Sequence, residues 1–138
     1  MRRRSRAREF ALQVLYQMDI TRDAYDVCLS NFWQAHIEEH IEEEIKNFAG
    51  ELVKGVADNL EVIDGKIAQY AANWQLKRMA FVDRNVLRLG SYELMFRNDI
   101  PLKVSINEAV ELVKKYSGPE AGKFVNGILD KIKPDKNK

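Results

Sequence analysis

No proline occurs before Pro101, and apolar side chains recur at helical spacing along almost the whole chain of 138 residues. Proline interrupts helices, and apolar residues at i, i+3, i+4 and i+7 line one helical face, so this pattern predicts a chain made of helices. The apolar stripes run over residues 7–18, 25–34, 41–56, 60–74, 82–94, 109–113 and 121–132. We expect an all-α fold with about seven helices, and the length suits one compact domain or two small subdomains that share a core.

Two serines predict where the last two helices begin. Ser105 stands three residues before Glu108, which is the spacing of a capping box. Ser117 and Glu120 repeat that spacing, with Pro119 near a first-turn position that proline tolerates. Within the last stripe, the pair at 126–127, Asn-Gly, is typical of a hairpin turn, but the helical stripe continues through it. We therefore predict helix there, at a cost of about 1 kcal/mol for the glycine relative to alanine.

The net charge of +1 conceals an uneven distribution. Residues 1–18 hold five arginines and one glutamate, whereas residues 19–44 hold one arginine and eight acids. The rest of the chain is mildly basic. This pattern indicates at least one anionic partner and is compatible with a separate protein partner.

The composition also excludes several classes. No uncharged stretch approaches the roughly 20 apolar residues that a membrane helix needs, and the basic start leads into Glu9 and Gln13 rather than the apolar core of a secretory signal. A lone Cys28 cannot form an internal disulfide, so a reducing cytoplasm is the expected location. We expect no membrane partner.

The first predicted helix begins with a cluster of cations: Arg2, Arg3, Arg4, Arg6 and Arg8. Cations are unfavourable at a helix N-terminus, by a few tenths to about 1 kcal/mol each, unless an anion joins them there. A helical wheel places Gln13 and Tyr16 on the same face as some of these arginines, beside the apolar stripe. Guanidinium, amide and phenol groups together suit the phosphates and unstacked bases of single-stranded RNA. A disordered, solubilising arm is the alternative.

Other motifs carry less weight. His36 and His40 have the i, i+4 spacing of zinc-dependent peptidases, but Ile37 replaces the glutamate that those enzymes need, so we expect a solvated surface and no metal. Residues 118–124, Gly-Pro-Glu-Ala-Gly-Lys-Phe, are one residue short of a phosphate-binding loop and lack its Ser/Thr, which favours a helix-to-helix turn. Cys28 lies between two apolar residues, where a buried thiol is common. We identify no catalytic residue and no cofactor site.

Four segments resemble the NusB transcription antitermination factors of bacteria: RRRSRAREFALQVLYQ, DRNVLRLGSYEL, IPLKVSINEAVELVKKYS and KFVNGILDKI. The resemblance covers residues 2–133 in order. It implies two small helical bundles packed together in a single RNA-binding domain, with approximate boundaries 1–57 and 58–138. It also implies a non-enzymatic role, in which the protein binds boxA-type RNA with the ribosomal protein NusE and helps RNA polymerase antitermination complexes to read through terminators, notably in rRNA operons.

The resemblance further implies which residues act. The RNA-binding positions correspond to Arg2, Arg3, Arg4, Arg6, Arg8, Gln13, Tyr16, Lys123, Phe124 and Asn126. The surface toward NusE includes Asp83 and Arg84. From the residues alone, the Phe124 ring could stack on a base or pack in the core, and the Tyr16 ring could cover the edge of the bundle.

Two other functions remain open at this level. Some RNA methyltransferases carry a similar domain, so the chain could serve as an accessory domain of an rRNA-modifying enzyme. It could also be a protein-interaction module whose arginines only keep it in solution. The sequence leaves open the preferred RNA sequence, the affinity and the oligomeric state, including a homodimer.

Overall fold

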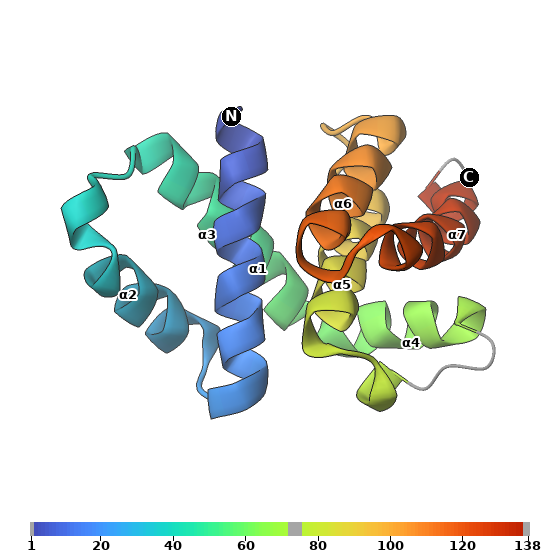
Figure 1. Cartoon of the computed structure of the whole chain (residues 1–138), viewed down its shortest axis with the longest axis horizontal. Coiled ribbons are helices and arrows are strands. Elements are labelled where there is room, and N and C mark those ends of the chain that lie inside the picture. The colour runs from blue at the N-terminus through green and yellow to red at the C-terminus, as the bar shows by residue number, and fades with distance from the viewer. Residues whose placement is uncertain (1, 72–75, 137–138) are drawn as a thin grey trace. The chain divides into compact units, whose positions relative to one another are not determined.

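A computed structural model describes residues 2–71 and 76–136, and for residues 77 and 134–136 it describes the backbone alone. In this part of the chain there are seven α-helices, two short 3₁₀-helices and no strand, which confirms the all-α prediction (Figure 1). The elements are α1 (Arg3–Thr21), α2 (Tyr25–Ala35), η1 (Ile37–Glu39), α3 (Glu43–Asp58), α4 (Leu60–Tyr70), η2 (Leu76–Arg78), α5 (Phe81–Phe96), α6 (Leu102–Ser117) and α7 (Pro119–Lys136). The expected continuation of the fourth helix to Trp74 lies outside the described residues.

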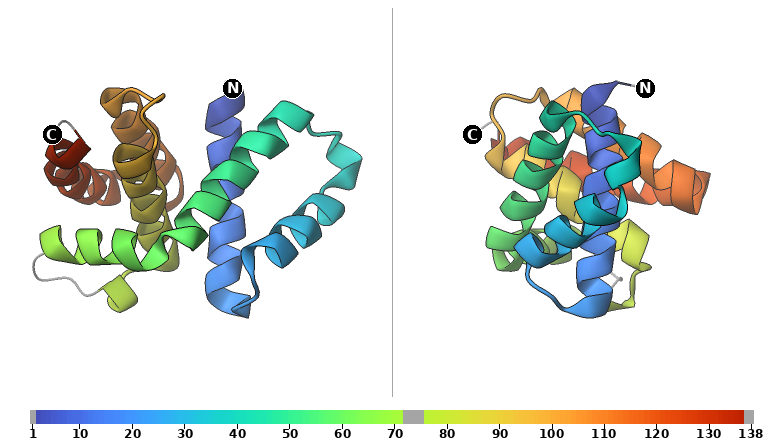
Figure 2. Two further views of the ribbon diagram at one scale, coloured as in Figure 1. Left: turned by 180° about the vertical axis from the view of Figure 1, so that it is seen from behind. Right: turned by 90° about the vertical axis from the view of Figure 1, so that its left-hand side faces the viewer.

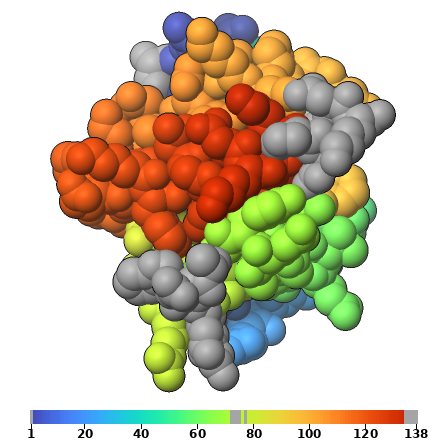
Figure 3. Space-filling view, turned by 90° about the vertical axis from the view of Figure 1, so that its right-hand side faces the viewer, coloured from blue at the N-terminus to red at the C-terminus, as the bar shows by residue number. Residues whose placement is uncertain are grey.

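The chain divides into two compact units, Met1–Asp58 and Asn59–Lys138. In the first unit α1 packs against α3 and α2, and η1 joins α2 to the segment before α3 (Figure 2). In the second unit α5, α6 and α7 pack on one another, and α4 lies against α5 and α7. On one face of the second unit α7 crosses between α6 and α4 (Figure 3).

The core of the first unit forms where the stripe of α1 meets aromatic side chains of α2. Phe10 is buried, and its ring lies edge-on to Phe32 and Trp33, with centroid separations of 5.7 Å in both cases. Such edge-to-face pairs add about 0.5–1.5 kcal/mol each beyond the area that they bury. From α3, Leu52 and Val53 are fully buried. The stripe predicted from spacing is therefore the face that the fold buries.

In the second unit, close packing of α5 on α7 depends on Gly90. A Cβ atom at this position would lie 2.8 Å from Leu129 Cδ1 and 3.3 Å from Ala109 Cβ, closer than carbon atoms normally approach. Gly90 therefore lets the helices pack with Leu129 and Leu94 fully buried. The glycine is required by the side chains across the interface and not by its own backbone conformation.

Two polar contacts, one partly buried and one fully buried, connect helices of this unit, and the sequence analysis did not find either. The Arg88 guanidinium donates to both carboxylate oxygens of Asp64, at 2.8 and 2.9 Å, and to Asn85 Oδ1 at 3.1 Å. Ser105 Oγ donates to Glu93 Oε1 at 2.8 Å, and both of these residues are about 1% exposed. These charge-assisted bonds connect α4 with α5 and α5 with α6.

The prediction that Ser105 caps a helix is wrong. Pro101 is the N-cap residue of α6, and its carbonyl accepts from the Ser105 amide at 3.2 Å, so Ser105 lies inside the first turn. Its hydroxyl donates a hydrogen bond to the buried Glu93 instead. Ser117 is likewise the last residue of α6, and Gly118 separates it from α7 with a φ of 92°. Since that φ disfavours any side chain, the turn needs glycine, and Pro119 opens α7 as expected.

Two further predictions concern local structure. The pair at 126–127 lies inside α7, which confirms helix over hairpin. His36 and His40 do not share one face of a helix, although their i, i+4 spacing would place them there. The reason is that α2 ends at Ala35 and His40 follows η1 with a left-handed φ of 50°. The His36 ring stacks on Phe32 at 4.0 Å, and its Nδ1 donates to the Phe32 carbonyl.

None of the helices in the described residues combines the length and the apolar character that spanning a bilayer would require. Among the same residues, no group of three or more histidine, cysteine, aspartate or glutamate side chains is arranged to hold a metal ion. Cys28 is a buried free thiol, 4% exposed, as its apolar neighbours predict.

Candidate nucleic-acid interface

The arginine cluster forms the first turns of α1. Arg2 lies just before the helix in an extended conformation and is exposed, and Arg3 is the first helical residue. The first turn contains no acid that would balance the positive end of the helix. The positive end of the helix and the exposed side chains of Arg2, Arg3 and Arg4 therefore occupy the same part of the chain, which favours a phosphate there.

Acidic side chains from the segment between α2 and α3 meet these arginines. Arg3 Nε lies 3.0 Å from Glu42 Oε2, and Arg3 Nη1 lies 3.1 Å from Glu44 Oε2. Arg6 Nη2 lies 3.7 Å from Glu39 Oε1. The side chains are between 41% and 69% exposed, so each pair contributes at most about 1 kcal/mol. The acidic stretch that the sequence analysis left without a role thus supplies counter-ions to the arginine cluster.

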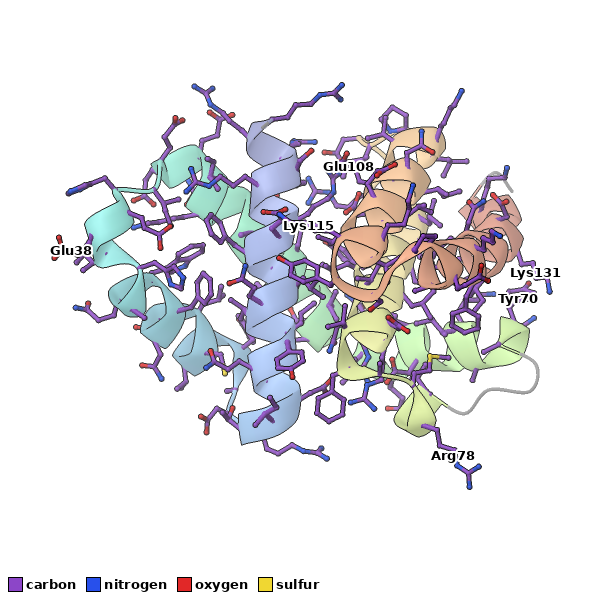
Figure 4. All side chains as sticks on the ribbon, viewed as in Figure 1. Glu38, Tyr70, Arg78, Glu108, Lys115 and Lys131 are labelled. Carbon is purple, nitrogen blue, oxygen red and sulfur yellow. The ribbon has the colours of Figure 1, made fainter. Side chains whose placement is uncertain are left out.

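Not every acid of this segment faces the arginines. The Glu38 side chain points away from η1 into solvent (Figure 4). Glu43, in the first turn of α3, is exposed, and none of the ion pairs in the described residues includes it. Which glutamates pair with the arginines therefore depends on where the fold places each side chain.

Two of the guanidinium groups lie over the faces of aromatic rings. The Arg4 guanidinium lies 4.2 Å from the centroid of the Phe48 ring, and that of Arg6 lies 5.2 Å from the centroid of Phe10. These cation–π contacts contribute about 0.5–1 kcal/mol at exposed sites and restrict the arginine rotamers. A cleft of about 340 Å³ lies beside them, lined by Arg3, Arg4, Glu44, Ile45, Asn47, Phe48 and Glu51.

Arg8 differs from the other four arginines because its side chain is buried. It is 4% exposed, and its guanidinium lies 5.5 Å from the Phe48 centroid. The physical reason is helical phase, because Arg8 shares a face with the buried Leu12 and Leu15, four and seven residues further on. A guanidinium in this place supports Phe48 and is not on the open surface.

Gln13 and Tyr16 continue the polar side of α1. Gln13 is half-buried, and Tyr16 is 40% exposed. Gln13 lies two turns after Arg6 on the same side of the helix, about 10 Å further along its axis. The part of the Tyr16 ring that faces solvent offers a surface on which a base could stack.

In the second unit, the three predicted residues lie along α7. Lys123 is 77% exposed at the side chain, and its Nζ lies 3.4 Å from Glu120 Oε1. Phe124 is half-buried, so its ring can both pack against the core and offer part of its surface to a base. Asn126 is exposed, and beside it a Cβ at Gly127 would meet nothing within 4 Å, so the backbone there is open to a ligand.

The two residues expected to face a protein partner start α5 but differ in exposure. Asp83 is half-buried in the first turn, where its charge complements the helix dipole. Arg84 is 9% exposed, its Nη1 donates to the Leu76 carbonyl at 3.5 Å, and its guanidinium lies 4.7 Å from the Phe81 centroid. The Arg84 guanidinium is therefore directed toward η2 and Phe81.

These observations define a small all-α protein that displays arginine, glutamine, tyrosine and lysine side chains on open helical surfaces. Residues 5–134 match the model of the NusB family. The chain belongs to the NusB family.

Named relatives match over most of the chain. The transcription antitermination protein NusB of Anaeromyxobacter dehalogenans (strain 2CP-1) is 52% identical over 130 residues, which cover 94% of this chain and 89% of the relative. The protein of the same name from Thermodesulfovibrio yellowstonii is 42% identical over 137 residues, with 94% and 91% covered.

Solved structures agree with the fold. The crystal structure of NusB from T. maritima has a TM-score of 0.86 at 39% identity and covers 96% of this chain and 91% of that one. NusB in a crystal structure of the antitermination factors NusB and NusE in complex with double-stranded RNA has a TM-score of 0.87 at 32% identity, with 98% of each chain covered.

Proposed function

We propose that this protein is a transcription antitermination factor that binds boxA-type single-stranded RNA together with NusE, a small-subunit ribosomal protein. The complex promotes read-through by RNA polymerase, notably in rRNA operons. The role is one of binding and not of catalysis, and it places the protein in the cytoplasm with the transcription machinery. The observation that carries the proposal is membership of the NusB family over residues 5–134, with relatives named as transcription antitermination proteins.

The geometry of α1 supports RNA binding. Arg2, Arg3, Arg4 and Arg6 are on the surface at the positive end of the helix, where they can contact successive phosphates. Phosphate contacts of this kind give affinity and position but little sequence information. Gln13 and Tyr16 add an amide and an aromatic ring, which suit unstacked bases.

Lys123, Phe124 and Asn126 on α7 form a second group of proposed RNA contacts. Asp83 and Arg84 are the proposed contacts to NusE, and Arg8 is a further proposed RNA contact. The guanidinium groups of Arg8 and Arg84 lie beside the rings of Phe48 and Phe81 in the free chain. The solved relative that contains NusE supports a protein partner of this kind. Its RNA is double-stranded, so the experiment below includes a duplex competitor.

The decisive experiment measures RNA affinity with and without purified NusE. We expect boxA-like single-stranded RNA to bind more tightly than a scrambled sequence, and NusE to increase both the affinity and the selectivity. Duplex RNA of the same sequence is the competitor. If NusE increases neither quantity, the antitermination role is refuted.

A salt titration tests the arginines themselves. Each phosphate neutralised on single-stranded RNA contributes about −0.7 to the slope of log affinity against log salt, so replacing Arg3, Arg4 and Arg6 by alanine should flatten the slope by about 2. Arg22→Ala, at the exposed C-cap of the same helix, is the matched control and should leave the slope unchanged. An unchanged affinity in the triple variant would refute the assignment of RNA binding to this end of α1.

A further inference from the structure

A cavity of about 430 Å³ lies between the start of α6 and the second half of α7, within the second unit. Its lining consists of Leu102, Lys103, Ile106, Asn107, Asn126, Asp130 and Lys133. The helical period explains the grouping, because Asn126, Asp130 and Lys133 follow one another at i, i+4 and i+7 along one side of α7. The volume is within the range of small-ligand sites.

The cavity has an apolar floor and a polar rim. Ile106 is 6% exposed and Leu102 is half-buried, so the floor is a hydrocarbon surface on which a planar ring can lie. The carboxamides of Asn107 and Asn126 are exposed, and in the described part of the chain neither makes a hydrogen bond through its side chain. The rim therefore offers free donors and acceptors around an apolar base, which is how proteins hold an unstacked nucleobase.

We propose that this cavity binds a guanine base of single-stranded RNA, an inference that rests on the proposed RNA-binding function. The carboxylate of Asp130 accepts from the N1–H and 2-amino groups of guanine. The asparagine amide groups at the rim can donate to its O6 and N7 atoms, which are hydrogen-bond acceptors. Adenine presents an acceptor at N1, which would face the carboxylate without a proton between them.

The charges at the rim leave Asp130 available for this role. Asp130 Oδ1 lies 3.9 Å from Lys133 Nζ, and the two side chains are 51% and 43% exposed. A pair this long and this exposed is worth little, so a base can replace it without large loss. Lys103 and Lys133 then remain to contact the phosphates on either side of the base.

The cavity also continues the proposed RNA contacts on α7. Lys123, Asn126, Asp130 and Lys133 are separated by three, four and three residues, so they follow one side of the helix. The ten helical steps from the first to the last of them span about 15 Å. A strand that contacts Lys123 can therefore run along α7 to the cavity, where its sequence is read.

The test uses the full chain and two short uridine-rich single-stranded RNAs that differ at one position, guanine or adenine. We expect the guanine RNA to bind at least about fivefold more tightly, which is the lower end of what a bidentate base contact provides. Asp130→Asn should reduce this ratio to near one, and the double variant Asn107→Ala/Asn126→Ala should reduce it as well. Glu111→Gln is the matched control, since it removes an exposed carboxylate of α6 outside the cavity and should keep the ratio.

The outcomes separate this proposal from the proposed function. The Arg3, Arg4 and Arg6 triple variant should weaken binding of both RNAs equally and leave the ratio intact. If the wild type binds RNA through its arginines but shows no guanine preference, or if Asp130→Asn keeps the preference, the guanine site is refuted and the RNA-binding function stands. If the wild type binds neither RNA, both proposals fail. Circular-dichroism melting curves that match the wild type establish that the variants are folded.

Discussion

Neutralising Glu42 and Glu44 should strengthen RNA binding, because these carboxylates occupy the guanidinium of Arg3. A phosphate that binds Arg3 has to displace both of them, at 3.0 and 3.1 Å. We expect the double variant Glu42→Gln/Glu44→Gln to bind single-stranded RNA more tightly than the wild type at low and physiological salt. The fold should not suffer, since both side chains are more than half exposed.

The exposure of the two pairs sets the size of this effect. Ion pairs between exposed side chains contribute about 0.2–1 kcal/mol each, so removing two of them lowers the cost of binding by about 0.4–2 kcal/mol. Each 1.4 kcal/mol is a factor of ten, which gives a decrease in Kd of about two- to thirtyfold. The gain should shrink as salt rises, because ions screen both the pairs and the phosphates.

The assay is a fluorescence-anisotropy titration of labelled RNA, arranged as a double-mutant cycle. Glu43→Gln is the matched control, because it removes one negative charge from the same segment at an exposed position that is not paired with Arg3. The change in RNA affinity of this control measures the long-range repulsion between one carboxylate of the segment and the RNA. In an Arg3→Ala background, the double variant should bind no more tightly than this general effect allows. A gain that Glu43→Gln reproduces, or that persists without Arg3, would refute competition for this guanidinium.

Three further predictions concern stability in chemical denaturation. Arg88→Ala leaves the partly buried carboxylate of Asp64 without its bidentate partner and should lower the free energy of unfolding by about 3 kcal/mol; a loss below 1 kcal/mol would contradict the role given to this pair. Ser105→Ala removes the buried bond to a glutamate and should cost about 1–3 kcal/mol, and no measurable loss would show that the bond contributes nothing. Gly90→Ala should destabilise the protein by about 1–3 kcal/mol, because the added methyl group clashes with Leu129. Gly127→Ala has open space around the added methyl group and should stabilise the protein by up to about 1 kcal/mol. Equal effects of the two substitutions would contradict the packing argument.

The helices were predictable because their signal is local. Apolar spacing identified the face of α1 that packs around Phe10, and it correctly outweighed the Asn-Gly pair within α7. The errors also had a local cause. Ser105 has the spacing of a capping residue, but Pro101 caps the helix one turn earlier. The serine hydroxyl instead donates to Glu93 on α5, and the capping pattern does not indicate that contact.

Exposure of charged residues was harder to predict. Arginine is usually a surface residue. Arg8 and Arg84 are nevertheless less than 10% exposed, because their positions on the helix direct their side chains toward Phe48 and Phe81. For Arg8 a signal existed, since Leu12 and Leu15 share its side of the helix. For Arg84 the partner carbonyl belongs to Leu76 in η2, a short element that the apolar stripes did not indicate.

By itself, the sequence determined that the chain is helical, where its helices lie, that positive charge gathers at the start of α1, and which family its motifs resemble. These properties depend on residues within a few turns of one another, so they can be read along the chain. Only the tertiary structure decided which charges face solvent, that Glu42 and Glu44 meet Arg3 some forty residues away, and that residues of α6 and α7 line one open cavity. Such contacts depend on how one helix packs against another, and the spacing within either helix does not contain that information.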